Sequence, residues 1–170
     1  TATVAVDGNG QVSVVSDSTP QGQGHRTVLA QIVADELGLT PDEIAVNVEL
    51  DTSKDAWSIA AGNYASRFAA STANAAYLAA GRIRKKLASI AGLALAVAPE
   101  NLNFKGGKIF SVLDPAKNLA FYRVAGMAHW SPGSLPEGTT PGLRETVQWN
   151  PRELTPPTDN DEINTSLTYG

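Results

Sequence analysis

A glycine-rich run near the start of the chain has the residue types best suited to bind a ligand. Residues 20–27 read PQGQGHRT, so two glycines alternate with two glutamines just before a segment with helical spacing. Glycine lets the backbone approach a ligand closely, and the N–H groups and dipole of a helix N-terminus attract anions. Glutamine amides can recognise the edge of a heterocycle. We therefore expect Gln21, Gly22, Gln23 and Gly24 to bind a cofactor that carries phosphate or a heterocyclic ring.

A second run of small residues, GNYASR at 62–67, also precedes a long segment with helical spacing. Ser66 is placed to cap that helix, and Arg67 is suited to pair with a phosphate group. Taken alone, the run is better explained as a capped helix with an exposed arginine. Two such loops can converge on one extended ligand, so we assign Tyr64, Ala65, Ser66 and Arg67 to the same cofactor site.

The glycine run has two competing interpretations. It could be an ordinary turn from strand to helix, although a turn does not need two glutamines. It could also be the phosphate loop of a dinucleotide-binding fold, but that fingerprint has a third glycine where this chain has Thr27. The hairpin pattern before the run also differs from the start of a βαβ unit. We therefore prefer a different kind of cofactor site.

Composition narrows the possible functions. The chain has 170 residues, a net charge of −4 and no cysteine. An acidic balance disfavours nucleic acid as a partner, and the lack of cysteine excludes disulfides and iron–sulfur ligands within this chain. Its two histidines, His25 and His129, lack the carboxylate–histidine spacing of a zinc site, and no apolar run is long enough to span a bilayer. We expect no catalytic residue and no metal ligand here.

Three other groups of polar residues are better explained as structural or solvated. His129, beside Trp130, is expected to serve structure or an interface. A basic cluster in the second half of the long helical segment is expected to be a solvated face; it consists of Arg82, Arg84, Lys85 and Lys86. The acidic group of Asp159, Asp161 and Glu162 is expected to be a solvated turn, with a metal site as the open alternative.

Hydrophobic spacing and turn residues predict an α+β fold in two layers, with a small mixed sheet, two main helices and an irregular proline-rich C-terminal tail. The expected elements are a hairpin at 1–17, helices at 27–37, 66–91 and 118–125, one helical turn at 40–43, a strand at 44–50, and a second hairpin around 106–107. We expect residues 1–130 to form the cofactor-binding part and 131–170 an irregular extension. The chain opens in strand alternation without methionine, so we expect it to be a segment of a larger subunit.

The ordered motifs resemble the molybdenum hydroxylases, the xanthine dehydrogenase and aldehyde oxidase family that includes bacterial carbon monoxide dehydrogenase-like large subunits. The resemblance rests on the loop at 21–27, the helix text at 28–38, the strand at 44–50, the run at 62–67, and the stretches 130–142 and 161–170. It spans essentially the whole chain. Each motif alone is moderately specific, and their ordered combination is highly specific.

The resemblance implies roles for both runs. By position, Gly22, Gln23 and Gly24 would help hold the pterin, and the backbone of Ala65 and Ser66 would lie close to molybdenum. Bacterial members generally carry the cofactor as molybdopterin cytosine dinucleotide. The family's catalytic base is a glutamate in a Gly-Glu motif, which this chain lacks. The chain would thus be inactive alone, as part of an oxidoreductase that hydroxylates a heterocycle or aldehyde carbon with water-derived oxygen.

The resemblance also implies partners. These are the remainder of the molybdenum-binding subunit, iron–sulfur and flavin (FAD) domains or subunits, and a small-molecule substrate, in a cytoplasmic enzyme without nucleic acid or a membrane span. Two alternatives stay open: a non-catalytic nucleotide-binding module, and an interaction domain whose proline-rich tail docks a partner. A downstream Gly-Glu motif and a cysteine-rich neighbouring subunit would favour the hydroxylase.

Overall fold

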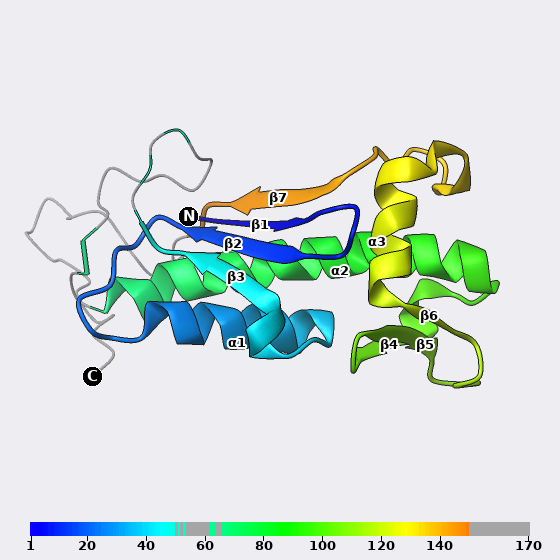
Figure 1. The fold of residues 1–170 in the computed structure, drawn as a ribbon, viewed down its shortest axis with the longest axis horizontal. Coiled ribbons are helices and arrows are strands. Elements are labelled where there is room, and N and C mark those ends of the chain that lie inside the picture. Colours follow the sequence, from blue (N-terminus) through cyan, green and yellow to red (C-terminus); the bar gives the residue numbers. More distant parts are fainter. Residues whose placement is uncertain (50, 52, 54–61, 64–65, 150–170) are drawn as a thin grey trace, which may run out of the picture.

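A four-stranded mixed sheet lies at the centre of the chain, with the strand order β3-β2-β1-β7 (Figure 1). Strands β1 (Ala2–Val6) and β2 (Val12–Ser16) form an antiparallel hairpin. Strand β3 (Ile44–Asn47) runs parallel to β2, and β7 (Leu143–Val147) runs antiparallel to β1. The sheet therefore joins the first and last described parts of the chain.

The structure is a computed structural model that describes residues 1–49, 51, 53, 62–63 and 66–149. Within these residues it has three α-helices and two small sheets, which confirms the predicted α+β class. No helix in this part of the chain combines the length and apolarity that crossing a membrane requires.

The first hairpin forms as predicted because its turn satisfies its own backbone groups. The Asp7 carboxylate accepts hydrogen bonds from the backbone N–H groups of Asn9 and Gln11, both at 2.9 Å. The N–H of Gly10 donates to the carbonyl oxygen of Asp7 at 3.0 Å. An aspartate that bonds the following backbone in this way is a common turn initiator.

Two helices cover one face of the four-stranded sheet and form the second layer (Figure 1). Helix α1 (His25–Leu37) begins two residues before the predicted start and ends at Gly38, as expected for a glycine cap. Helix α2 (Ala73–Leu95) is the long predicted helix, and it runs four residues further than expected. The buried core between the layers includes Val4, Val6, Val12, Val14, Leu29, Val33, Ala76, Ala80, Ile83 and Leu87.

The start of the long helix has an unusual geometry. Residues Phe68–Thr72 form a π-helical turn, η2, in which the N–H of Ala73 bonds the carbonyl oxygen of Phe68. Such wide turns are rare inside helices and are frequent at functional sites. The sequence pattern predicted one continuous helix from residue 66 and did not reveal this wide turn.

A second, antiparallel sheet lies at the other end of the molecule (Figure 1). It consists of β4 (Leu102–Lys105), β5 (Lys108–Ser111) and β6 (Asn118–Ala120), and the hairpin around Gly106 and Gly107 is confirmed. Helix α3 (Phe121–Trp130) follows β6 directly. The prediction of a helix at 118–125 is therefore wrong for residues 118–120, where the chain instead pairs with β5.

Short helical turns connect several of these elements. They are η1 (Pro41–Glu43), η3 (Pro99–Asn101) and η4 (Pro132–Ser134), and each begins with proline. The predicted helical start at 40–43 is confirmed by a capping box between Thr40 and Glu43. Proline suits the first helical position because its N–H would be unsatisfied there anyway.

The prediction that residues 131–170 are irregular is wrong for β7. This strand pairs along the whole length of β1, with Leu143 opposite Val6 and Val147 opposite Ala2. Leu143 and Val147 are buried, so the strand completes the core instead of lying apart from it. The predicted strand at 44–50 is shorter than expected, because β3 ends at Asn47; residue 50 lies outside the described part.

Candidate functional site

The two loops selected from the sequence lie at the same end of the molecule, beyond the end of β2 (Figure 1). The Ser18 hydroxyl donates to Oδ1 of Asn63 at 2.8 Å, and the Asn63 amide donates to the carbonyl oxygen of Thr19. The rings of His25 and Phe68 stack with centroids 3.7 Å apart. The beginning of α1 and the beginning of the long helix are therefore held against each other.

The glycine loop is exposed and leaves room for a ligand. All four residues from Gln21 to Gly24 are exposed. Gly22 and Gly24 have φ values of 107° and 74°, and a Cβ added to either would meet no atom of the described residues within 4 Å. Oε1 of Gln23 accepts a hydrogen bond from the backbone N–H of Gln21, so its side chain folds over the loop. The loop shape requires glycine, but none of the described residues fills the space beside Gly22 and Gly24.

The N-terminus of α1 is suited to an anion. Gly24 is its N-cap, no side chain caps it, and its first turn contains no acidic residue. The positive end of the helix dipole therefore lies directly behind the glycine loop, and no acidic residue of the first turn offsets it. Backbone N–H groups at such an end are ready donors to phosphate.

His25 is a buried residue of this site that the sequence reasoning did not select. Its side chain is 1% exposed, and its Nδ1 atom has no hydrogen-bond partner within the described part of the chain. Burial lowers the pKa of His25 below 6.5, against a smaller opposing effect of a hydrogen bond with the Ser18 backbone. A neutral imidazole with a buried, unsatisfied nitrogen calls for a partner. Its position directly after Gly24 was the only signal in the sequence.

The second loop is described only in part. Tyr64 and Ala65 lie outside the described residues, so their predicted roles stay predictions. Ser66 has a φ of 54°, a left-handed conformation that is uncommon for a residue with a side chain. Arg67 precedes η2, and the carbonyl oxygen of Ser66 accepts a hydrogen bond from the N–H of Ala70 at 3.2 Å, so the expected side-chain cap at Ser66 stays a prediction. Strained backbone of this kind clusters at ligand sites.

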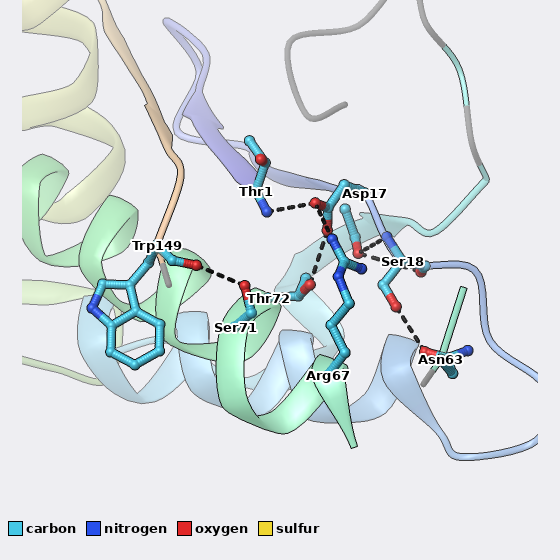
Figure 2. A network of polar contacts seen from close by, with 9 residues as sticks. Thr1, Asp17, Ser18, Asn63, Arg67, Ser71, Thr72 and Trp149 are labelled. Atoms are coloured by element: carbon cyan, nitrogen blue, oxygen red, sulfur yellow. Dashed lines mark hydrogen bonds and ion pairs between the residues drawn. The ribbon is translucent and has the colours of Figure 1, made fainter. Parts of the chain in front are cut away.

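A buried carboxylate connects the two loops. Asp17, directly after β2, is fully buried, and its Oδ2 accepts hydrogen bonds from Arg67 Nη2 at 2.9 Å and from the backbone nitrogen of Thr1 at 2.6 Å (Figure 2). Its Oδ1 accepts from the Thr72 hydroxyl at 2.9 Å. The guanidinium predicted to pair with a phosphate therefore pairs with Asp17 in this structure. The sequence reasoning missed Asp17, because its partners lie 50 and 55 residues further along the chain.

The remaining polar candidates lie elsewhere and are structural. Nε2 of His129 lies 2.8 Å from the carbonyl oxygen of Val6, and so ties α3 to the first hairpin. Arg84 bonds the Glu36 backbone and stacks 4.3 Å above the Phe104 ring, so this member of the basic cluster is packed, not simply solvated. The acidic group at 159–162 lies outside the described residues. Elsewhere in the described chain, no three metal-ligating side chains gather.

Comparison with known proteins identifies the protein family to which this chain belongs. The family model of the molybdopterin cofactor-binding domain matches residues 1–170. The chain therefore belongs to this family, which confirms the resemblance to molybdenum hydroxylases.

Among curated proteins, the chain is similar to the large subunits of several enzymes. The chain is 35% identical over 151 residues to the nicotine 6-hydroxylase large subunit of Paenarthrobacter nicotinovorans, covering 88% of this chain and 18% of that one. It is 34% identical over 137 residues to the carbon monoxide dehydrogenase large chain of Hydrogenophaga pseudoflava, covering 81% and 16%. The chain thus spans less than a fifth of these curated relatives.

Solved structures agree with this assignment. Quinoline 2-oxidoreductase from Pseudomonas putida 86 matches with a TM-score of 0.80 and 32% identity, over 89% of this chain and 19% of that one. Reconstituted CO dehydrogenase from Oligotropha carboxidovorans matches with a TM-score of 0.75 and 29% identity, over 89% and 18%. The likeness therefore extends to the arrangement of the elements that carry the two loops.

Proposed function

We propose that this chain is the part of a molybdenum hydroxylase large subunit that holds molybdopterin as its cytosine dinucleotide. One observation carries the proposal: within a molybdopterin cofactor-binding domain, an exposed glycine loop at an uncapped helix N-terminus lies against a second loop with strained backbone. An elongated ligand, with a pterin at one end, a cytidine at the other and a pyrophosphate between them, fits two adjoining loops of this kind. The carbon monoxide dehydrogenase and nicotine hydroxylase relatives support the same reading.

The residues of the glycine loop fit such a ligand. Gly22 and Gly24 leave open space for close approach, and the first turn of α1 offers N–H groups to phosphate. The amides of Gln21 and Gln23 would donate to and accept from the pterin ring. The unsatisfied Nδ1 of His25, at the base of the loop, fits a polar group of the ligand.

The second loop would complete the site near the metal. We assign Tyr64, Ala65 and Ser66 to the backbone that lines the cofactor, and Arg67 to the same loop. When bound, the cofactor would supply the redox centre at which a heterocycle or aldehyde carbon gains water-derived oxygen. The chain's own contribution is binding and orientation, which needs no titrating residue here.

The whole protein would work with further parts. We propose a cytoplasmic enzyme in which the remainder of the large subunit supplies the substrate pocket and a Gly-Glu base. Iron–sulfur and flavin subunits would carry electrons away from the molybdenum. The relative named as a 6-hydroxypseudooxynicotine dehydrogenase complex subunit is consistent with such an assembly.

The experiment is a cofactor analysis of the full-length protein purified with its neighbouring subunits. We expect molybdenum and cytidine nucleotide in near-equimolar amounts with the large subunit. Molybdenum with a pterin but without cytidine would contradict the dinucleotide form alone. The absence of both, in a host that loads a known molybdenum hydroxylase, would contradict the proposal and favour a nucleotide-binding module.

A further inference from the structure

Asp17 is a buried carboxylate with charged and polar partners on the second loop and the π-helical turn. It lies directly after β2, it is fully buried, and it forms an ion pair with Arg67 at 2.9 Å (Figure 2). A carboxylate removed from water is costly unless charged and polar groups surround it. Here Arg67 and the Thr72 hydroxyl satisfy both carboxylate oxygens from one side.

The π-helical turn is what brings both partners to the same carboxylate. Arg67 and Thr72 are five residues apart, and in a π-helix a hydrogen bond closes across five residues. Residues at this spacing lie a little more than one π-helical turn apart, so their side chains can reach the same group. In a regular α-helix the same two side chains would diverge around the axis.

We infer that Asp17 is a positioning residue whose carboxylate, through Arg67 and Thr72, fixes the second loop against the glycine loop and so retains the cofactor. This inference rests on the proposed function. Arg67 follows Ser66 directly, so a fixed guanidinium also fixes the strained backbone before it. On the other side, Ser18 follows Asp17 and bonds Asn63 of the same loop at 2.8 Å.

The ion pair between Asp17 and Arg67 is better explained by the orientation of two chain segments than by the stability of the fold. Replacing a buried ion pair with well-packed apolar residues is often neutral or stabilising, so such pairs are poor evidence for stability. What a charged pair with fixed hydrogen bonds does provide is a defined geometry between two segments. Here the two segments are the end of β2, from which the glycine loop begins, and the start of η2.

The test compares variants of the full-length protein in complex with its partner subunits. They are Asp17→Asn, Arg67→Gln and the double variant. Asparagine keeps the shape and one oxygen acceptor for Thr72 but removes the charge. Because removing one member of a buried pair can unfold a protein, the double variant, which removes both charges, is the decisive one. Glu145→Gln is the control, since Glu145 lies 3.7 Å from Arg82 in a partly exposed pair elsewhere.

Two measurements are made on each protein: the rate at which cytidine dinucleotide and molybdenum are lost on dialysis, and hydrogen exchange of the amides at 67–72. We expect the double variant to keep the thermal midpoint of the wild type. It should nevertheless lose the cofactor about tenfold faster, the lower end of what loss of a supporting contact costs a bound centre. Each single variant that folds should show the same increase, because both remove the same contact.

Cofactor loss at the wild-type rate from the double variant would overturn the inference. So would unchanged exchange at 67–72, and this second measurement does not need a cofactor. A wild-type protein without molybdopterin would contradict the proposed function and the retention claim with it. In that case, faster exchange in the variants would still support the positioning of the second loop by Asp17.

Discussion

Glycines at the two ends of this molecule differ in the space that surrounds them. At the end with the second sheet, a Cβ on Gly38 would overlap the carbonyl group of Phe104, and a Cβ on Gly8 would overlap the indole of Trp130. At the loop end, a Cβ on Gly22 or Gly24 would meet no atom within 4 Å in the described part of the chain. Gly8 and Gly38 are therefore needed for the protein's own packing, whereas Gly106 and Gly107, in a turn of the second sheet, would not bring a Cβ within 4 Å of a described atom. At Gly22 and Gly24 only the backbone conformation requires glycine, and the space beside them is where we propose that the ligand binds.

Polar groups show the same contrast. At the loop end, His25 is buried with an unsatisfied nitrogen, and Ser66 has a left-handed backbone. At the other end, His129 bonds the carbonyl oxygen of Val6, and Arg84 bonds Glu36 and Asn103. The unsatisfied nitrogen of His25 therefore lies at the end where the ligand is proposed to bind, as expected when binding completes a site. Left-handed non-glycine backbone occurs at both ends, at Ser66 and at Ala96, the C-cap of α2.

The largest effect on folding should come from the packing glycine. Gly38→Ala introduces a side chain at a φ of 69° and against the Phe104 backbone. We expect the free energy of unfolding to fall by about 3 kcal/mol, from strain and overpacking together. A chemical denaturation midpoint measures this. Gly133→Ala is the control, because a Cβ there would meet nothing within 4 Å; equal midpoints for the two variants would break the comparison.

The next effect is a pH dependence from His25. Because burial lowers its pKa in the folded state, the unfolded state takes up the proton first as the pH falls below 6.5. The contribution of the neutral His25 side chain to the free energy of unfolding is therefore fully present above pH 6.5. It is lost below that pH, by at most about 1.4 kcal/mol per pH unit for one proton. Thermal midpoints of wild type and His25→Gln between about pH 7.5 and about pH 5.5 test this. Parallel profiles for the two proteins would count against a buried neutral His25.

A loop glycine should separate stability from binding. Gly24→Ala adopts a left-handed conformation without a clash, so we expect a loss of about 1 kcal/mol in unfolding free energy. Its molybdenum content should nevertheless fall well below that of Gly38→Ala protein that folds. Measuring both quantities for both variants sharpens the comparison. A Gly24→Ala protein with full cofactor content would contradict a ligand beside this glycine.

The smallest effect on folding should come from Gln23. Its side chain is exposed, so Gln23→Ala should change the unfolding free energy by less than about 0.5 kcal/mol. Cofactor occupancy should fall, because the amide that we propose to contact the pterin is lost. Gln31→Ala, an exposed glutamine on the outer side of α1, is the matched control. Equal molybdenum content and activity in the two variants would remove Gln23 from the site.

Much of this fold could be predicted from local patterns. The first hairpin, the glycine cap at Gly38 and the turn at Gly106 and Gly107 all follow from turn chemistry within a few residues. The strand β7 was missed because the many prolines around it favoured an irregular chain. Leu143 and Val147 lie on one face of β7, but the charged Glu145 between them interrupts the apolar alternation, and the pairing with β1 depends on contacts across the whole chain.

The candidate site also has parts that local sequence predicts and parts that it does not. The glycine loop could be found from sequence because its backbone demands particular residues. Asp17, His25 and Phe68 could not, since each acts through a partner that is distant in sequence. The π-helical turn at Phe68–Thr72 could not be predicted either, because apolar spacing averaged over a long helix does not show one wide turn. Such contacts arise from packing between segments, which a spacing rule does not encode.

The most direct test of the central claim is hydrogen exchange of the loop amides, in full-length protein prepared with and without the molybdenum cofactor. If the glycine loop and the first turn of α1 bind the cofactor, the amides of residues 21–27 should exchange at least about tenfold more slowly in the loaded protein. Those of the Gly106 and Gly107 turn, at the other end, should not change. Equal exchange at 21–27 in the two preparations would contradict the account.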